Sequence, residues 1–149
     1  MLKRIPAWFL LAAAAAWAAV CMSACSSAII GEALSKPDEY SHTYEAKSKY
    51  ILPAVAGAFK ERGLGKDVRI DWERQTVESD YITRDNIRTR GVARVKKVGA
   101  KENEVSLSVI TERKAGHGWE QRRLVEKEEY ERIFSRIEVK IYQEMYKEQ

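Results

Sequence analysis

Cysteine and histidine are scarce in this chain, with two residues of each among 149. A metal centre built from protein side chains needs three or four converging ligands, and closely spaced Cys and His pairs are absent here. The sequence therefore predicts no metal site and no cofactor. With eight glycines and three prolines, the chain is also neither collagen-like nor of low complexity.

Motifs that bind nucleotides or activate a serine are missing as well. Gly63-Leu64-Gly65 and Gly116-His117-Gly118 are too short for a dinucleotide fingerprint, and no phosphate loop is present. Ser106 or Ser108 could be combined with His117 and Asp80, but no Gly-x-Ser-x-Gly elbow holds a serine on a strained turn. We expect a protein that is not an enzyme. A hydrolase remains an alternative, and it requires Asp80 and His117 to meet in a pocket.

Charge is missing from residues 5–22, whereas the chain after Glu32 is densely charged. Lys3 and Arg4 precede this apolar run, which is the order of a secretion signal. Eighteen uncharged residues also reach the lower length limit of a membrane-spanning helix, so a retained anchor is an alternative. The alanine block Ala12 to Ala16 is only weakly apolar and favours a cleaved signal.

The apolar run ends at Met22-Ser23-Ala24-Cys25, which resembles the lipobox of bacterial lipoproteins. Cys21 competes for the role, but it follows the β-branched Val20, where that family has a small residue such as Ala24. The resemblance implies a signal peptide over residues 1–24 and a cysteine, Cys25, that becomes the first residue and carries lipid, including palmitate. It also implies a periplasm-facing location in the cell envelope. Ser26 after the cysteine resembles the sorting residue of outer-membrane members. A secreted form without lipid is the remaining alternative.

Residues 25–42 are predicted to be the lipidated cysteine and a tether, because Ser, Gly, Lys and Pro occur there with little periodicity. Attached acyl chains would hold the protein at a membrane surface while the rest stays in water. With Cys25 acylated, the mature chain has no cysteine left for a disulfide, so the domain over residues 43–149 must be stabilised by its own core.

The domain is predicted to begin with a helix capped by Ser41 or Thr43 and running to about Arg62, since apolar residues recur there at three to four positions. Pro53 should kink or divide it. A second amphipathic helix is predicted from Glu126 to about Lys147.

Between these helices the apolar pattern has a period of two, which is typical of half-buried strands. In the first strand Ile70 and Trp72 point one way, and Asp71 and Glu73 point to the solvated side. Strands are predicted in five ranges, 68–73, 77–83, 91–98, 104–112 and 119–124. The fold class is therefore α+β: a two-layer sandwich in which an antiparallel meander of four to five strands carries both helices on one face and leaves the other open.

Residues 84–101 carry seven basic side chains and one acid, Asp85. Nucleic acid is not an expected partner, because an exported lipoprotein seldom meets it and interleaved aromatic residues are missing. These cations would either protect an exposed sheet edge from aggregation or bind an acidic protein, anionic lipid or lipopolysaccharide. The tryptophan after the glycine turn would be either core or an interface anchor. The candidate partner-binding residues are Arg88, Arg90, Arg94, Lys96, Lys97 and Trp119.

The order of a helix, Gly63-Leu64-Gly65, a strand over 68–73 and a second strand ending Ser79-Asp80-Tyr81-Ile82 is similar to domains of the C lipoprotein of the outer-membrane β-barrel assembly machinery. This similarity of pattern implies a scaffolding role and transfers no functional residue. We expect a membrane-anchored, non-enzymatic module whose exposed sheet face or edge binds an envelope protein. The alternative is a binder of anionic envelope lipid or lipopolysaccharide through residues 84–101.

Overall fold

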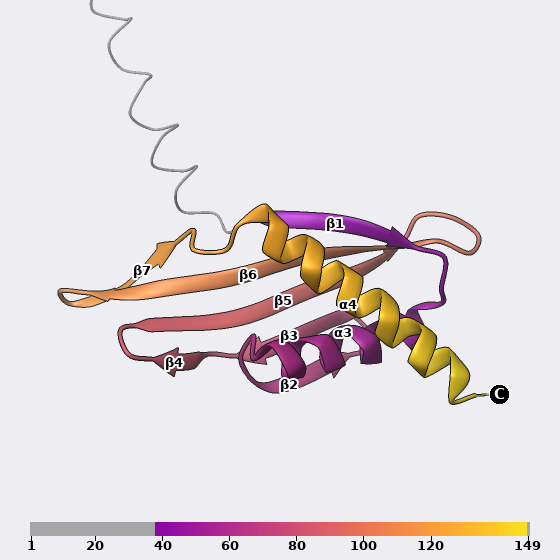
Figure 1. Ribbon diagram of the computed structural model, residues 1–149, viewed down its shortest axis with the longest axis horizontal. Helices are drawn as coiled ribbons and strands as arrows, with labels where there is room; N and C mark the ends of the chain where they lie inside the picture. Colours follow the sequence, from indigo (N-terminus) through magenta and orange to yellow (C-terminus); the bar gives the residue numbers. More distant parts are fainter. Residues whose placement is uncertain (1–37, 149) are drawn as a thin grey trace, which may run out of the picture. The chain divides into compact units, whose positions relative to one another are not determined.

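The computed structural model of the chain describes residues 38–148, which belong to one compact unit. One antiparallel sheet of seven strands carries two helices on one face (Figure 1). The predicted two-layer α+β sandwich is confirmed, with seven strands in place of four or five. The lipobox, Cys25 and most of the predicted tether lie outside the described residues.

The elements in chain order are β1 (Glu39–Tyr44), α3 (Ser48–Arg62), β2 (Lys66–Asp71), β3 (Thr76–Asp80), β4 (Ile82–Arg84), β5 (Ile87–Lys97), β6 (Asn103–Ala115), β7 (Gly118–Arg122) and α4 (Lys127–Tyr146). The sheet order is β1-β6-β5-β3-β2, with β4 paired to the first part of β5 and β7 to the last part of β6. The meander from β2 to β6 is thus extended by β1, which precedes α3 in the chain, and by β7, which forms a hairpin with β6.

β1 is the main departure from the prediction. Residues 39–44 were expected to end the tether and cap a helix, but they pair antiparallel with β6, from Glu39 opposite Ser108 to Tyr44 opposite Asn103. Tyr40 and Tyr44 alternate with polar residues, which is the period of a strand. The domain boundary expected at residue 43 therefore falls inside β1, and α3 begins at Ser48.

Pro53 does not divide the first helix, since α3 runs unbroken from Ser48 to Arg62. Proline lacks the N–H that would bond the carbonyl four residues earlier. At Pro53 that partner is Lys49, next to the start of the helix, so the loss is confined to one hydrogen bond in the first turns.

The second predicted strand is split into β3 and β4 by a β-bulge. Four residue steps from Glu78 to Ile82 face only three steps on β5, because Glu78 is opposite Val92 and Ile82 is opposite Thr89. The extra residue places both Asp80 and Tyr81 beside Arg90 of β5, which decides the geometry of the surface described below.

Trp72 differs from the prediction that it lies on the apolar face of a strand. It occupies the turn between β2 and β3 and is about half exposed, at 51%. The Asp71 carboxylate accepts the N–H groups of Glu73 and Arg74 at 3.0 and 2.9 Å, so the strand ends one residue before Trp72.

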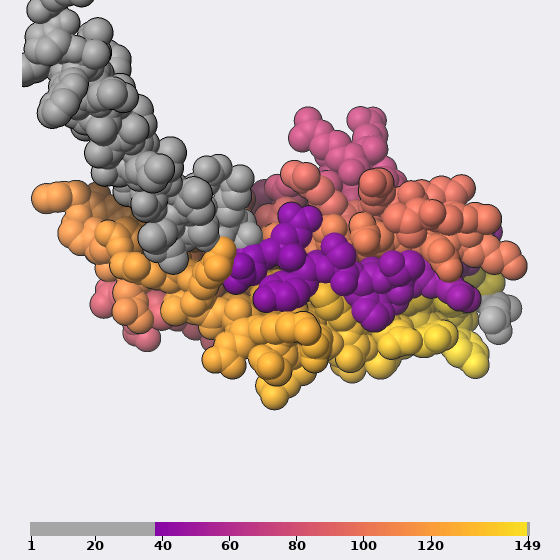
Figure 2. All heavy atoms as spheres, turned by 90° about the horizontal axis from the view of Figure 1, so that it is seen from above, coloured from indigo at the N-terminus to yellow at the C-terminus, as the bar shows by residue number. Residues whose placement is uncertain are grey.

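The core lies between the helices and the sheet. Figure 2 looks onto the β1 edge of the sheet, with α4 (yellow) on one side of β1. Its largest fully buried side chains include Phe59 of α3, Leu107 of β6 and Tyr130 of α4. Phe59 lies directly on Gly91 of β5, where an added Cβ would be 2.6 Å from Phe59 Cε2. The absence of a side chain at Gly91 therefore allows α3 to approach the sheet closely.

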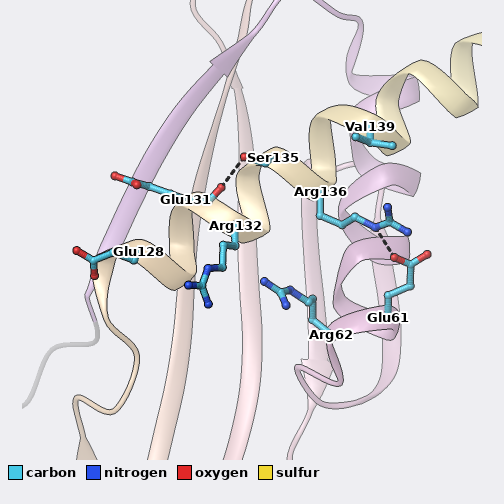
Figure 3. A pocket seen from close by; sticks show the side chains of 8 residues that line it. All are labelled: Glu61, Arg62, Glu128, Glu131, Arg132, Ser135, Arg136 and Val139. Carbon is cyan, nitrogen blue, oxygen red and sulfur yellow. Dashed lines mark hydrogen bonds and ion pairs between the residues drawn. The ribbon is translucent and has the colours of Figure 1, made fainter.

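Ion pairs join the outer surfaces of the two helices. Figure 3 shows Arg62 of α3 and Arg132 of α4 extending into one groove. Both pair with Glu129, at 2.9 and 3.3 Å. The Glu61 carboxylate accepts hydrogen bonds from Arg136 Nε at 2.6 Å and from Lys140 Nζ at 2.5 Å.

Glu61→Gln is expected to make stability less dependent on pH in the acid range. The hydrogen bonds from Arg136 and then Lys140 lower the pKa of Glu61 to about 2, against an ordinary value of 4.5. The unfolded chain therefore binds this proton first, and the stabilisation present above pH 4.5 is lost as pH falls through 2. Urea unfolding at several pH values measures the slope. High salt should shrink the difference between wild type and variant, because the pairs are exposed; equal slopes at low salt would contradict the expectation.

Candidate functional site: the open sheet face

The open sheet face is the side of the sheet that carries neither helix in the described part of the chain. The strand pairings and the alternation of side chains identify its residues. They are Glu39, Ser41, Thr43, Lys66, Arg69, Asp71, Thr76, Glu78, Asp80, Tyr81, Thr83, Arg88, Arg90, Val92, Arg94, Lys96, Glu104, Ser106, Ser108, Ile110, Glu112, Lys114, Trp119 and Gln121. The face is polar throughout, with only Val92 and Ile110 as aliphatic residues.

Opposite charges are nearly balanced on the open sheet face. Its cations are Lys66, Arg69, Arg88, Arg90, Arg94, Lys96 and Lys114, and its carboxylates are Glu39, Asp71, Glu78, Asp80, Glu104 and Glu112. The basic row on β5 is flanked by acids on the neighbouring strands. The face therefore mixes charges of both signs and has one more cation than carboxylates, although the basic segment stood out in the sequence.

A stacked cluster of aromatic and charged groups lies where β4, β5, β6 and β7 meet. The Arg88 guanidinium lies 4.3 Å from the Tyr81 ring centre and 4.6 Å from that of Trp119. Arg88 Nε donates to Glu112 at 2.5 Å, and Tyr81 Oη donates to the same carboxylate at 2.6 Å. Burial, and then the bond to Glu112, raise the pKa of Tyr81. Tyr, Trp and Arg are the residues enriched in binding hot spots.

Arg90 lies next to this cluster, at the edge of a hollow of about 300 Å³ in the middle of the face. The hollow is lined by Glu39, Glu78, Arg90, Val92, Arg94, Ser106, Ser108 and Ile110. Arg90 approaches the Tyr81 ring at 5.1 Å, and its buried Nε has no hydrogen-bond partner among the residues that the structure describes.

The predicted partner-binding residues fall into two groups. Arg88, Arg90, Arg94 and Lys96 share the open sheet face with Trp119, so the structure gathers five of the six. Lys97 points to the opposite side, because it follows Lys96 on β5 and is paired with Asn103. Trp119 is half-buried, and its ring packs on Arg88.

The residues of the hydrolase alternative are not brought together. Both oxygens of Asp80 accept hydrogen bonds from Arg69, at 2.9 and 2.6 Å, and these bonds lower the pKa of Asp80. His117 is exposed in the turn between β6 and β7. Seven residues separate Ser108 from Ala115, the last residue of β6, which is about 23 Å of strand. His117 is therefore out of reach of Ser106 and Ser108.

Other features of residues 38–148 are less suited to binding a ligand. The groove between α3 and α4 measures about 630 Å³, but the Arg62, Arg132 and Arg136 guanidiniums that line it are already paired with carboxylates. Among the same residues no group of His, Cys, Asp or Glu is arranged to hold a metal ion. Neither described helix has the length and apolar character needed to cross a bilayer.

Sequence reasoning missed the partners that shape the site. Tyr81 and Asp80 reach Arg90 through a β-bulge, which no turn residue announces. Glu112 belongs to the predicted strand over 104–112, and its alternation with Val109 and Thr111 could have placed it on the open side. Its pairing with Arg88 depends on the strand register, which becomes visible only in the folded sheet.

Comparison with known proteins adds no assignment. No family model matches the chain. No curated protein matches it at a significant level.

Proposed function

We propose that the chain is a bacterial lipoprotein, anchored in the cell envelope by lipid on Cys25, whose open sheet face binds an envelope protein without catalysing a reaction. Support for the anchor comes from the charged start, the apolar run and the lipobox Met22-Ser23-Ala24-Cys25. The expected site is the periplasmic face of the outer membrane, with the domain in water.

The observation that carries the protein-binding part is the open sheet face itself. A sheet face with alternating charges and a stacked Tyr81, Arg88 and Trp119 cluster suits a polar protein surface of complementary pattern. Anionic lipid or lipopolysaccharide as the ligand of residues 84–101 is the alternative. It is supported less well, because the carboxylates on the face offset all but one of its cations at the distances over which a membrane attracts a protein.

Photocrosslinking in intact cells tests the proposal. A photoreactive amino acid at Thr76 of the open sheet face is expected to yield a protein adduct, whereas one at the exposed Ser135 of α4, on the helix side, is not. Recovery of lipid alone, or of nothing, from Thr76 would count against a protein partner. Lipid adducts that disappear at high salt would favour the alternative.

The Cys25→Ala form is the matched control for the anchor. It should lose incorporation of labelled palmitate, and its Thr76 adduct should fall because the domain is no longer concentrated at the membrane. Unchanged palmitate labelling in this form would contradict a lipid anchor on Cys25. The protein-binding part of the proposal would still be tested by the Thr76 adduct.

A further inference from the structure

Arg90 lies on the open sheet face, and its Nε is buried. Among the described residues, no group accepts a hydrogen bond from this Nε. An arginine side chain presents five N–H donors and stays charged at all physiological pH values. Buried donors in native proteins normally have partners, so a buried donor without one calls for an explanation. No acceptor among residues 38–148 has therefore taken up this guanidinium from its Nε side, and only its terminal nitrogens can meet a group from another molecule.

Two of the carboxylates beside Arg90 are already engaged, whereas Glu78, opposite Val92, lines the same hollow and competes for Arg90. Asp80, beside Arg90 at the bulge, is bound through both oxygens by Arg69. Glu112, one pair further along β6, accepts hydrogen bonds from Arg88 and Tyr81. Tyr81 covers Arg90 with its ring and supplies no acceptor to it. Arg90 is thus positioned by its neighbours. Its Nε is shielded from solvent, so an incoming group would meet the terminal nitrogens of the guanidinium on the side of the hollow.

The hollow beside Arg90 contains groups that can pair with an anionic side chain. Arg90 and Arg94 lie on β5, and on β6 the hydroxyl groups come from Ser106, opposite Arg94, and Ser108, opposite Val92. Val92 also lines the hollow as an apolar contact. A planar guanidinium matches a carboxylate with two parallel hydrogen bonds, and a serine hydroxyl can donate a further one.

We propose that this hollow is a carboxylate-binding site in which an aspartate or glutamate side chain of the protein partner pairs with Arg90. The inference rests on the proposed function and names the chemistry of its partner. Glu39 and Glu78 line the same hollow, so a doubly charged phosphate meets more repulsion there than a singly charged carboxylate does. The near balance of charge on the face also leaves little long-range attraction to an anionic lipid surface. A carboxylate on a protein fits both conditions.

The test combines the crosslinking label at Thr76, which lies outside the hollow, with substitutions inside and outside it. Arg90→Gln is expected to lower the yield of the protein adduct by at least about tenfold, because a charge-assisted contact is lost. Lys114→Gln, which removes a cation of the same face away from the hollow, should change it less than about twofold. Glu78→Gln, which removes an internal competitor for Arg90, should leave the yield equal or raise it.

Three outcomes separate this inference from the proposed function. A protein adduct of unchanged yield in Arg90→Gln overturns the carboxylate site and leaves the protein-binding face standing. No protein adduct in the wild-type chain overturns both. A label found only on lipid overturns both in favour of a membrane-facing surface. Thermal unfolding of Arg90→Gln is expected to match wild type, so that loss of the adduct is not loss of the fold.

The crosslinked product also identifies the partner residues that lie near the open sheet face. The crosslinked peptide of the partner, mapped by mass spectrometry, is expected to contain an aspartate or glutamate. Its replacement by the amide should lower the yield as much as Arg90→Gln does, and the two changes together should add little further. A mapped peptide without an acidic residue, or fully additive effects, contradicts pairing with Arg90.

Discussion

Gly65→Ala is expected to destabilise the domain by about 3 kcal/mol or more, from the combined cost of backbone strain and overpacking. Gly65 precedes β2 with φ +125°, a conformation that side chains rarely adopt. A Cβ there would lie 2.1 Å from Ser79 Oγ and 2.5 Å from the carbonyl oxygen of Asp80. Ser79 cannot move aside, because its hydroxyl donates to Leu64 O at 2.6 Å and accepts the Gly91 N–H at 2.9 Å.

Thermal unfolding followed by circular dichroism measures this effect, and a fall of the midpoint by about 10 °C or more is expected for a domain of this size. Gly118→Ala is the matched control, since its Cβ would meet no atom within 4 Å and its φ lies outside the left-handed region. Equal unfolding temperatures for Gly65→Ala and Gly118→Ala would contradict a clash with Ser79 as the cause of the destabilisation.

Tyr130→Phe is expected to cost about 2 kcal/mol, because it leaves a buried backbone N–H and a part-buried carbonyl oxygen without their partner. β1 pairs with β6 up to Ser108, and β7 pairs with it from Thr111 onward, so the β6 edge between them lacks a strand. The Tyr130 hydroxyl fills this gap. It accepts the Val109 N–H at 3.0 Å and donates to the carbonyl oxygen of Asp38 at 3.2 Å.

Urea unfolding measures the cost, with Tyr142→Phe on the exposed side of the same helix as the control. A loss for Tyr130→Phe no greater than for Tyr142→Phe would contradict the role of the hydroxyl. Burial raises the pKa of Tyr130 in the folded chain. The unfolded chain therefore loses this proton first as pH rises past about 10, and stability falls there. The phenylalanine variant should lose part of that alkaline slope.

The predicted site depended on a charge run, and charge alone did not distinguish the two sides of a strand from each other. Arg94 and Lys97 are close in sequence, but alternation places them on opposite sides of β5. The acids that offset the basic row come from β1, β2, β3 and β6, which lie outside the basic segment itself. The composition of one segment therefore predicts which residues are cations, but not which charged side chains lie next to them in the folded sheet.

Local pattern by itself determined which segments become helices and central strands, because the 3.6 and 2.0 periods of apolar residues reflect the geometry of a single element next to a core. The amphipathic stripe of α4 and the alternation of β6 are read directly from neighbouring residues. Only the tertiary structure decided that Glu39–Tyr44 is a strand, that a bulge turns Tyr81 toward Arg90, and that the Tyr130 hydroxyl closes a sheet edge. Each of these depends on pairing or contact between separate elements, which the spacing of residues within one segment does not encode.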